Sequence, residues 1–306
     1  MAMLYYTHPA CKLHEMGEGH PECPARLDAI NDRLLSSGVA DLLLEREAPR
    51  AAQEALLRVH TVEYLESLME RAPAAGYAEL DPDTVMNPHT YEAALRAAGA
   101  AIAAVDAVLA GEGEAAFCAV RPPGHHACPD RAMGFCFLNN VAIAARHAMA
   151  HHGLERIAVI DFDVHHGNGT EAALAGDPRV LMCGFFQHPF YPFSGADPWA
   201  DNMLNQPLPA YTEGAAVREL VTSRWLPRLE RFKPQLVLIS AGFDAHREDD
   251  LGRMGLVEAD FAWMTEQLGE LAGRHGARMV SCLEGGYNLS ALGRSVTAHI
   301  RALAGI

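Results

Sequence analysis

Side chains able to bind a metal or move a proton stand directly after several short apolar runs. The runs cover 116–120, 157–160, 236–240 and 279–283, and the polar residues that follow them are His125, His126, Asp161, Asp163, His165, Asp244 and Tyr287. Imidazoles and carboxylates bind divalent metals, histidine transfers protons near neutral pH, and a phenol can donate to a developing oxyanion. Together these residue types predict a catalytic site.

Asp161, Asp163 and His165 alternate along the chain. Alternate residues of an extended segment point the same way, so two of them could act with Asp244 from a neighbouring strand as an Asp-His-Asp set. Three protein ligands with an open fourth position are typical of catalytic Zn²⁺, and a set without thiolate would also accept Fe²⁺ or Mn²⁺. The plainer alternative is a polar strand end whose aspartates cap the next helix.

His125 and His126 follow Pro-Pro-Gly, which stiffens the chain before them. In a turn, both imidazoles can point into one cleft, where they would suit general acid–base catalysis. Each would need an orienting partner on its far nitrogen, and Asp161 and Asn168 are the candidates. The alternative is a metal-binding pair or a pair of surface histidines.

Tyr287 follows Gly285-Gly286, whose conformational freedom can swing the phenol over a site. There it could donate to an oxyanion, although a tyrosine in the core is the commoner reading of such a motif alone. The sequence has no glycine-rich phosphate loop and no GxSxG elbow. We therefore expect no nucleotide site.

The elements that must position these residues alternate along the later chain. Buried strands are predicted at 116–120, 157–160, 180–183, 236–240 and 279–283, and helices at 24–37, 91–110, 139–152, 169–174, 214–232, 258–275 and 289–303. This alternation predicts an α/β fold with a mostly parallel sheet and helices on both faces. Sites in such sheets form beyond the carboxyl ends of the strands. We expect one domain over 1–306, to which the first 90 residues add helices and loops.

Composition and charge narrow the class of protein. The chain has 306 residues, of which 50% are hydrophobic, and a formal net charge of −15. It can bury a sizeable core, and so acidic a protein is a poor candidate for binding nucleic acid. Its 7 cysteines contain no CxxC pair, which indicates free thiols in a reducing compartment. Without a signal-peptide pattern or a long apolar run, we expect a cytoplasmic protein that does not enter membranes.

Read together, the motifs resemble the zinc-dependent histone deacetylase superfamily. They are His20-Pro-Glu-Cys-Pro-Ala-Arg26, Arg121-Pro-Pro-Gly-His125-His126, Gly134-Phe135-Cys136-Phe137, Asp161-Phe-Asp163-Val-His165-His166-Gly-Asn168-Gly, Ser240-Ala-Gly-Phe-Asp244 and Glu284-Gly-Gly-Tyr287. They extend through nearly the whole chain and are jointly specific. The His-His-Gly-Asn and Ser-Ala-Gly-Phe-Asp forms are similar to the class II branch and its bacterial amidohydrolase homologues.

The resemblance implies a fold, an activity and a cofactor. The fold would be the arginase/deacetylase fold, a parallel sheet of about eight strands with helices on both sides. The activity would be a metal-dependent amidohydrolase that removes acetyl or other acyl groups from lysine side chains in proteins or peptides. The implied ligands of Zn²⁺, with Fe²⁺ also possible, are Asp163, His165 and Asp244.

The resemblance also implies catalytic roles. His126 would be the general base and acid, oriented by Asn168, and His125 would be an electrostatic helper, oriented by Asp161. Tyr287 would stabilise the tetrahedral oxyanion. Some relatives have an aspartate where Asn168 stands. A neutral amide stabilises the imidazolium less than a carboxylate does, so we expect a different pH optimum from those relatives.

Further residues would shape the substrate pocket. By the same resemblance, Phe135 and Tyr191 would line a tunnel for the acyl-lysine stem, with Gly134 beside it. Arg26 and Cys136 would lie near an inner pocket that holds the acyl group and the released acid.

The residue at 251 bears on the substrate. Relatives that deacetylate polyamines carry an acidic residue seven positions after the third metal ligand, and that position here is Leu251. An apolar residue there favours acyl-lysine over acetylpolyamine. Acidic residues nearby, at 248–250, keep acetylpolyamine or another small amide open as the alternative substrate.

One position departs from the family pattern. Many relatives hold a structural K⁺ partly through a serine after the next strand, and Gly184 stands in its place, which puts that ion in question. An arginase-like site with two metals would need further carboxylates after Asp163 and His165, and His166-Gly-Asn168 supplies none. A binding module without activity would lack the base or the tyrosine, and both are present.

Overall fold

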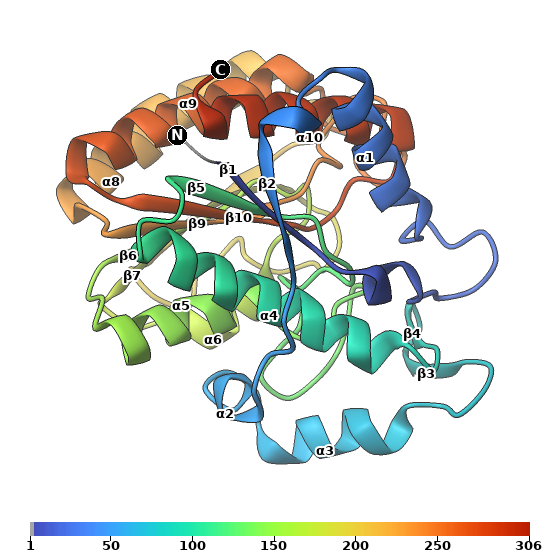
Figure 1. Ribbon diagram of the computed structural model, residues 1–306. Coiled ribbons are helices and arrows are strands. Elements are labelled where there is room, and N and C mark those ends of the chain that lie inside the picture. Colours follow the sequence, from blue (N-terminus) through green and yellow to red (C-terminus); the bar gives the residue numbers. More distant parts are fainter. Residues whose placement is uncertain (1–2) are drawn as a thin grey trace.

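The computed structural model describes residues 3–306, and its centre is an eight-stranded sheet (Figure 1). The strand order is β2-β1-β5-β10-β9-β6-β7-β8, and every pairing within this sheet is parallel. The strands are β1 (Met3–Thr7), β2 (Leu43–Glu47), β5 (Ala115–Cys118), β6 (Ile157–Asp161), β7 (Val180–Gln187), β8 (Met203–Leu208), β9 (Leu236–Ala241) and β10 (Arg278–Leu283). The predicted α/β fold with a parallel sheet is confirmed. Residues 1 and 2 of the predicted domain lie outside the described residues.

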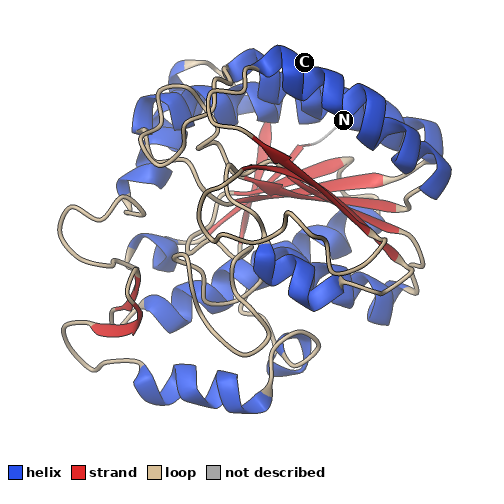
Figure 2. Cartoon of the chain, turned by 180° about the vertical axis from the view of Figure 1, so that it is seen from behind, coloured by secondary structure: helices blue, strands red, loops and turns tan. Residues whose placement is uncertain are grey.

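Helices cover both faces of the sheet, as predicted (Figure 2). On one face lie α1 (Ala25–Ser36), α9 (Glu258–His275) and α10 (Leu289–Ala304), with α7 (Gly214–Leu220), η3 (Val221–Trp225) and α8 (Leu226–Phe232) beside them. On the other face lie α4 (Thr90–Leu109), α5 (Asn140–His152) and α6 (Asn168–Leu174). The shorter helices η1 (Pro9–Lys12), η2 (Ala40–Leu42), α2 (Gln53–Leu56) and α3 (Val62–Arg71) belong to the first part of the chain.

The first 90 residues contribute more than the predicted helices and loops. They supply β1 and β2 of the main sheet and a separate antiparallel pair, β3 (Ala78–Asp81) and β4 (Thr84–Met86). The edge strand β2 has the sequence Leu-Leu-Glu-Arg-Glu and is mostly exposed, so it shows no apolar run. Strand β1 has the sequence Met-Leu-Tyr-Tyr-Thr and is almost fully buried, and it too was not predicted.

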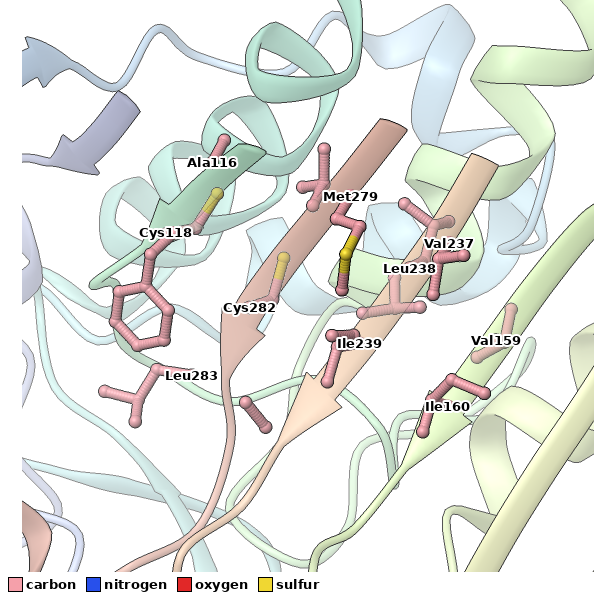
Figure 3. Close-up of a cluster of buried hydrophobic side chains, with 14 of the residues drawn as sticks. Ala116, Cys118, Val159, Ile160, Val237, Leu238, Ile239, Met279, Cys282 and Leu283 are labelled. Carbon is pink, nitrogen blue, oxygen red and sulfur yellow. The ribbon is translucent and has the colours of Figure 1, made fainter. Parts of the chain in front are cut away.

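The core lies between the sheet and each helical layer. Every residue of β5, β6, β7 and β9 is buried. Figure 3 shows side chains of β5, β6, β9 and β10 packed together. Helix α4 faces the core largely with alanines. Its Gly99 lies so close to the loop after β2 that a Cβ there would be 1.9 Å from the carbonyl oxygen of Pro49.

Four strands that carry the predicted chemistry are neighbours in the sheet. Their order is β5-β10-β9-β6, so their carboxyl ends form one edge, and the loops after them can meet there. Helices α4 and α5 run against the strands and end close to where β5 and β6 begin. Within residues 3–306, none of the helices is long and apolar enough to cross a membrane.

Candidate active site

Three side chains converge at the carboxyl edge of the sheet. Asp163 and His165 follow β6, Asp244 follows β9, and one ligand atom from each lies within 4.8 Å of the other two. His165 Nδ1 is 2.9 Å from Asp163 Oδ1 and 3.2 Å from Asp244 Oδ2. Asp163 and Asp244 are 1% and 0% exposed. The alternation of the sequence and the order of the strands thus place two carboxylates and one imidazole around a common point.

Backbone N–H groups fix these carboxylates. Gly285 donates to Asp163 Oδ2 at 2.9 Å, and Val164 donates to Asp244 Oδ1 at 2.9 Å. Position 285 needs glycine, because a Cβ there would lie 2.0 Å from Asp244 Oδ2. The carboxylates are therefore oriented by loops from three strands before any ligand binds.

The remaining oxygen of Asp244 indicates what the cluster lacks. Asp244 Oδ2 is buried and accepts no well-aligned hydrogen bond, although His165 Nδ1 lies 3.2 Å away. Burial raises the pKa of Asp244 to about 7, and the negative charge of Asp163 contributes. A buried carboxylate oxygen without a donor is costly unless a cation meets it. Two carboxylates and one imidazole also match the ligands that Zn²⁺ and Fe²⁺ prefer, so these residues fit a divalent metal.

Two histidines lie beside this cluster, and each contacts one polar partner. Asp161 is not part of the Asp163–His165–Asp244 cluster, and its Oδ2 lies 3.0 Å from His125 Nδ1. His126 Nδ1 lies 2.7 Å from Asn168 Oδ1. Both far-nitrogen partners named from the sequence are therefore in contact with their histidines.

The two imidazoles have opposite electrostatic surroundings. Burial disfavours the charged form of both, but the carboxylates of Asp163 and Asp161 raise the pKa of His125 well above its usual value. Burial and the neighbouring rings of His125 and His165 lower the pKa of His126 well below that value. Adjacent groups whose pKa values are pushed apart can divide the roles of fixed cation and proton acceptor.

Tyr287 is fixed through its backbone and its ring. Its N–H donates to Asp249 Oδ2 at 2.6 Å, and the Arg26 guanidinium lies 5.0 Å from the ring centroid. Arg26 also donates to two carbonyl oxygens of the loop after β10, one of them that of Gly286 at 2.7 Å. Burial and the charge of Asp244 raise the pKa of Tyr287 well above its usual value, so the phenol keeps its proton.

Aromatic rings border the catalytic histidine and the tyrosine. The Tyr191 ring meets the His126 ring edge-on, with centroids 5.3 Å apart, and the Phe135 ring meets Tyr287 in the same way at 5.9 Å. Gly134 has a φ of 56°, and a Cβ there would lie 2.4 Å from the His126 ring. The three residues predicted to line the tunnel therefore lie beside His126 or Tyr287.

Three more positions were singled out from the sequence: Leu251, Cys136 and Gly184. Leu251 is half-buried, and its N–H donates to Asp249 Oδ1 at 3.0 Å. Cys136 is fully buried, and burial raises the pKa of its thiol well above the usual value. Gly184 pairs with Asp161 between β6 and β7, and a Cβ there would only reach ordinary contact with Asp161, at 3.5 Å. A serine would fit at 184, so packing does not require the glycine.

A buried network of charges holds Arg26. The Glu22 carboxylate accepts from Arg26 at 3.0 Å and from Arg121 at 2.6 Å, and all three residues are fully buried. Burial opposes the charge of Glu22, but the guanidinium groups, Arg121 first, hold the pKa of Glu22 well below its usual value. The sequence analysis singled out Arg26 alone, because nothing in the spacing pairs Glu22 with a residue about 100 positions later.

Other supporting residues were not predicted either. Glu284 accepts from the backbone N–H of His125 at 3.1 Å, and so orients the turn that carries both histidines. His166 links Ser194 and Glu171, at 2.9 Å from each, and thereby braces the loop that holds Tyr191. Glu284 and His166 lie within motifs that the sequence displays, but their partners do not.

Known proteins resemble this chain over most of its length. The model of the histone deacetylase domain family matches residues 20–303. The histone deacetylase-like amidohydrolase of Pseudomonas aeruginosa is 42% identical over 296 residues, which are 94% of this chain and 78% of that protein. The human polyamine deacetylase HDAC10 is 39% identical over 93% of this chain and 45% of its own length.

A solved structure agrees with these relatives. The crystal structure of the HDA15 HD domain superposes with a TM-score of 0.93 at 34% identity, covering 99% of this chain and 90% of that one. Together with the buried metal-type cluster, these matches decide the class of protein. The chain belongs to the histone deacetylase domain family and is a metal-dependent hydrolase of that family.

Proposed function

We propose that the protein removes acetyl or other acyl groups from lysine side chains in proteins or peptides, with one divalent ion held by Asp163, His165 and Asp244. The observation that carries the proposal is the buried Asp163–His165–Asp244 cluster, beside which stand two histidines with opposite electrostatic surroundings. Zn²⁺ is the ion we infer, and Fe²⁺ is the alternative with the same ligand preference.

The protein's own residues supply the proton transfers. A divalent ion at this site would polarise the amide carbonyl and lower the pKa of the attacking water. His126 is neutral, and because Nδ1 faces Asn168, its Nε2 is free to accept the proton of that water. The same nitrogen then returns the proton to the leaving amine, and the products are a carboxylate and a free amine.

Two further groups stabilise the charge that develops. His125 stays cationic beside Asp161 and offsets negative charge during the attack. Tyr287 keeps its proton and donates a hydrogen bond to the oxyanion. Arg26 and Asp249 do not touch the reacting atoms in this scheme, and act by holding Tyr287.

The acidic residues near Leu251 support lysine as the substrate amine. Asp249 already accepts three backbone N–H groups, from Leu251, Tyr287 and Asn288, and Glu248 pairs with Arg294 at 2.8 Å. Neither is therefore a free carboxylate for a second amine of a polyamine, whereas Asp250, the third acidic residue of this segment, is exposed. The half-buried Leu251 offers an apolar wall instead.

Acetylpolyamine is the second candidate, because the human relative HDAC10 is a polyamine deacetylase. The test compares kcat/KM for an acetyl-lysine peptide and for acetylspermidine. We expect the peptide to be preferred by about tenfold or more, and Leu251→Glu to shift the ratio toward acetylspermidine, with Leu251→Met as the matched control. A wild-type preference for acetylspermidine would overturn the lysine assignment.

A panel of acyl peptides with Zn²⁺- and Fe²⁺-loaded protein extends the same assay to the acyl group and the metal.

A single catalytic ion is part of the proposal. The side chain after His165 that could bridge a second ion is His166, and its ring is engaged by Ser194 and Glu171. We therefore expect the carboxyl edge of the sheet to bind one ion per chain and not the pair that an arginase-like hydrolase needs.

A further inference from the structure

A second group of metal-binding side chains lies outside the catalytic site, on α4 and α5. His147 Nε2 and His152 Nε2 each lie 2.7 Å from the same oxygen, Oδ1 of Asp106. One ligand atom from each of the three residues lies within 4.8 Å of the other two. Asp106 comes from the last turn of α4, and both histidines come from the C-terminal half of α5.

This group is remote from the catalytic residues in the fold. Helix α5 ends at His152 and β6 begins at Ile157, so the end of the helix lies near the amino ends of the strands. The catalytic loops follow the opposite, carboxyl ends. Figure 1 shows α4 and α5 side by side below the sheet.

We propose that Asp106, His147 and His152 form a second site, specific for a divalent late transition metal such as Zn²⁺. Two imidazoles and one carboxylate are ligands of this class of ion rather than of Mg²⁺ or Ca²⁺, which take oxygen ligands. Metal bonds of about 2.0–2.1 Å require ligand atoms roughly 3 Å apart. The three ligand atoms already surround one point, so small side-chain rotations complete the site.

The burial of the three residues suits an open coordination shell. The His147 ring is 8% exposed and stacks on His151 at 4.5 Å, so one ligand is held in place. His152 and Asp106 are 31% and 48% exposed, which leaves the other positions to water. A hollow of about 210 Å³, lined by Ala103, Asp106, His147 and His151 among others, gives access from the surface.

A positive charge near the group is paired with a carboxylate. The guanidinium of Arg58 lies 3.3 Å from His151 Nε2 and 2.7 Å from Glu54. In the metal-free form, one oxygen of Asp106 accepts from both imidazoles. A bound ion replaces those two N–H donors, and it links α4 to α5 only when the protein is folded.

The test counts ions. Protein stripped with a chelator is dialysed against buffered, micromolar Zn²⁺, and bound zinc per chain is measured by mass spectrometry. We expect two ions for the wild type and one for His152→Ala and for Asp106→Asn. His275→Ala is the matched control, because His275 also stands in the last turn of a long helix beside a glutamate, Glu230, and that variant should keep two ions.

A second set of variants separates this site from the catalytic one. Asp244→Asn should lose the catalytic ion and keep the one on α4 and α5. His152→Ala should keep its deacetylase rate within about twofold. In the Asp244→Asn background, His152→Ala should abolish the rise in melting temperature that added Zn²⁺ gives Asp244→Asn alone. It should also weaken zinc binding at this site by more than about 100-fold, which exceeds the cost of losing an outer partner. A wild type that binds no more zinc than His152→Ala, or a second ion that survives in both His152→Ala and Asp106→Asn, would overturn the proposal.

Discussion

The protein contains two clusters of aspartate and histidine that are built in opposite ways. The cluster at the carboxyl edge of the sheet comes from loops and is buried, with Asp244 0% exposed, whereas the cluster on α4 and α5 comes from helices, with Asp106 48% exposed. One oxygen of Asp244 accepts no well-aligned hydrogen bond, while one oxygen of Asp106 contacts two imidazole nitrogens at 2.7 Å. Burial therefore makes an ion a requirement in the first cluster, and exposure makes it optional in the second.

The support behind the two clusters differs as well. Backbone N–H groups of Val164 and Gly285 orient the catalytic carboxylates, so those side chains cannot relax when a neighbour is removed. The residues on α4 and α5 are held mainly by each other. We therefore expect a substitution to have a larger effect on activity and stability in the cluster at the carboxyl edge than in the cluster on α4 and α5.

The largest expected effect comes from breaking the buried cluster. Asp244→Asn should lower kcat by about 10³-fold or more, exceeding the loss of a single oxyanion donor, because the ion that organises the reaction is lost. Deacetylation assays together with zinc counting check this. Retention of both activity and the catalytic ion would contradict the assignment of Asp244 as a ligand.

Tyr287→Phe should cost less. It removes one hydrogen bond to the oxyanion while Arg26 and Asp249 still hold the loop, so kcat should fall by about 10²–10³-fold with the fold and the ion retained. Single-turnover kinetics on an acetyl-lysine peptide measure the loss. A rate near that of the wild type would remove Tyr287 from the chemistry.

In the metal-free protein, the two clusters should contribute differently to the free energy of unfolding. Because the pKa of Asp244 is raised to about 7, its charged form destabilises the fold, and this cost appears as the pH rises above the unfolded-state pKa and is complete above about 7. At pH 8, Asp244→Asn should therefore raise the free energy of unfolding by a few kcal/mol, at about 1.4 kcal/mol per pKa unit. Asp106→Asn, at the exposed cluster, should change it by less than about 1 kcal/mol. Denaturant titrations of chelated protein decide between them, and equal effects at both sites would contradict the role given to burial.

Asn168→Asp should shift the pH profile. A carboxylate at 2.7 Å from His126 Nδ1 would stabilise the imidazolium and raise its pKa by about one unit. Since only neutral His126 accepts a proton, the acidic limb of kcat/KM should move to higher pH by the same amount. An unchanged limb would mean that another group sets it.

The smallest effect concerns the monovalent ion. Gly184 offers no side-chain oxygen next to Asp161, so activity should differ by less than about twofold between KCl and NaCl. Gly184→Ser fits at ordinary contact distance, and is the variant in which a K⁺ dependence should appear. A strong preference of the wild type for K⁺ would show that backbone carbonyls suffice.

The sequence predicts the centre of this site better than its support. Asp163, His165 and Asp244 could be found because polar residues after buried strands meet at one edge of a parallel sheet. The alternation alone could not decide between Asp161 and Asp163, since it places both on the same side of an extended segment. The family resemblance assigned Asp161 to His125, and the structure has that contact. Asp249 was out of reach, because its partners are backbone N–H groups about 40 positions away, which leave no pattern.

The same limit applies to the fold. The buried strands β5, β6, β7, β9 and β10 stand out as apolar runs, and the long helices show their periodicity. The edge strand β2 does not, because its charged and exposed side chains suit a sheet edge and resemble a loop. Its place is decided by pairing with β1, which is a property of the assembled sheet.

The bonds from Arg26 to the loop after β10 have a consequence for biosynthesis. A side chain from the first tenth of the chain steadies a segment from its last tenth, and the ligands lie between them. A ribosome-bound fragment that stops before β10 therefore lacks Gly285 to orient Asp163, and the guanidinium of Arg26 lacks its two carbonyl acceptors. Assembly of a working centre, and with it secure loading of the ion, must wait until β10 and the loop after it are made, so no product that ends before β10 should hydrolyse an amide.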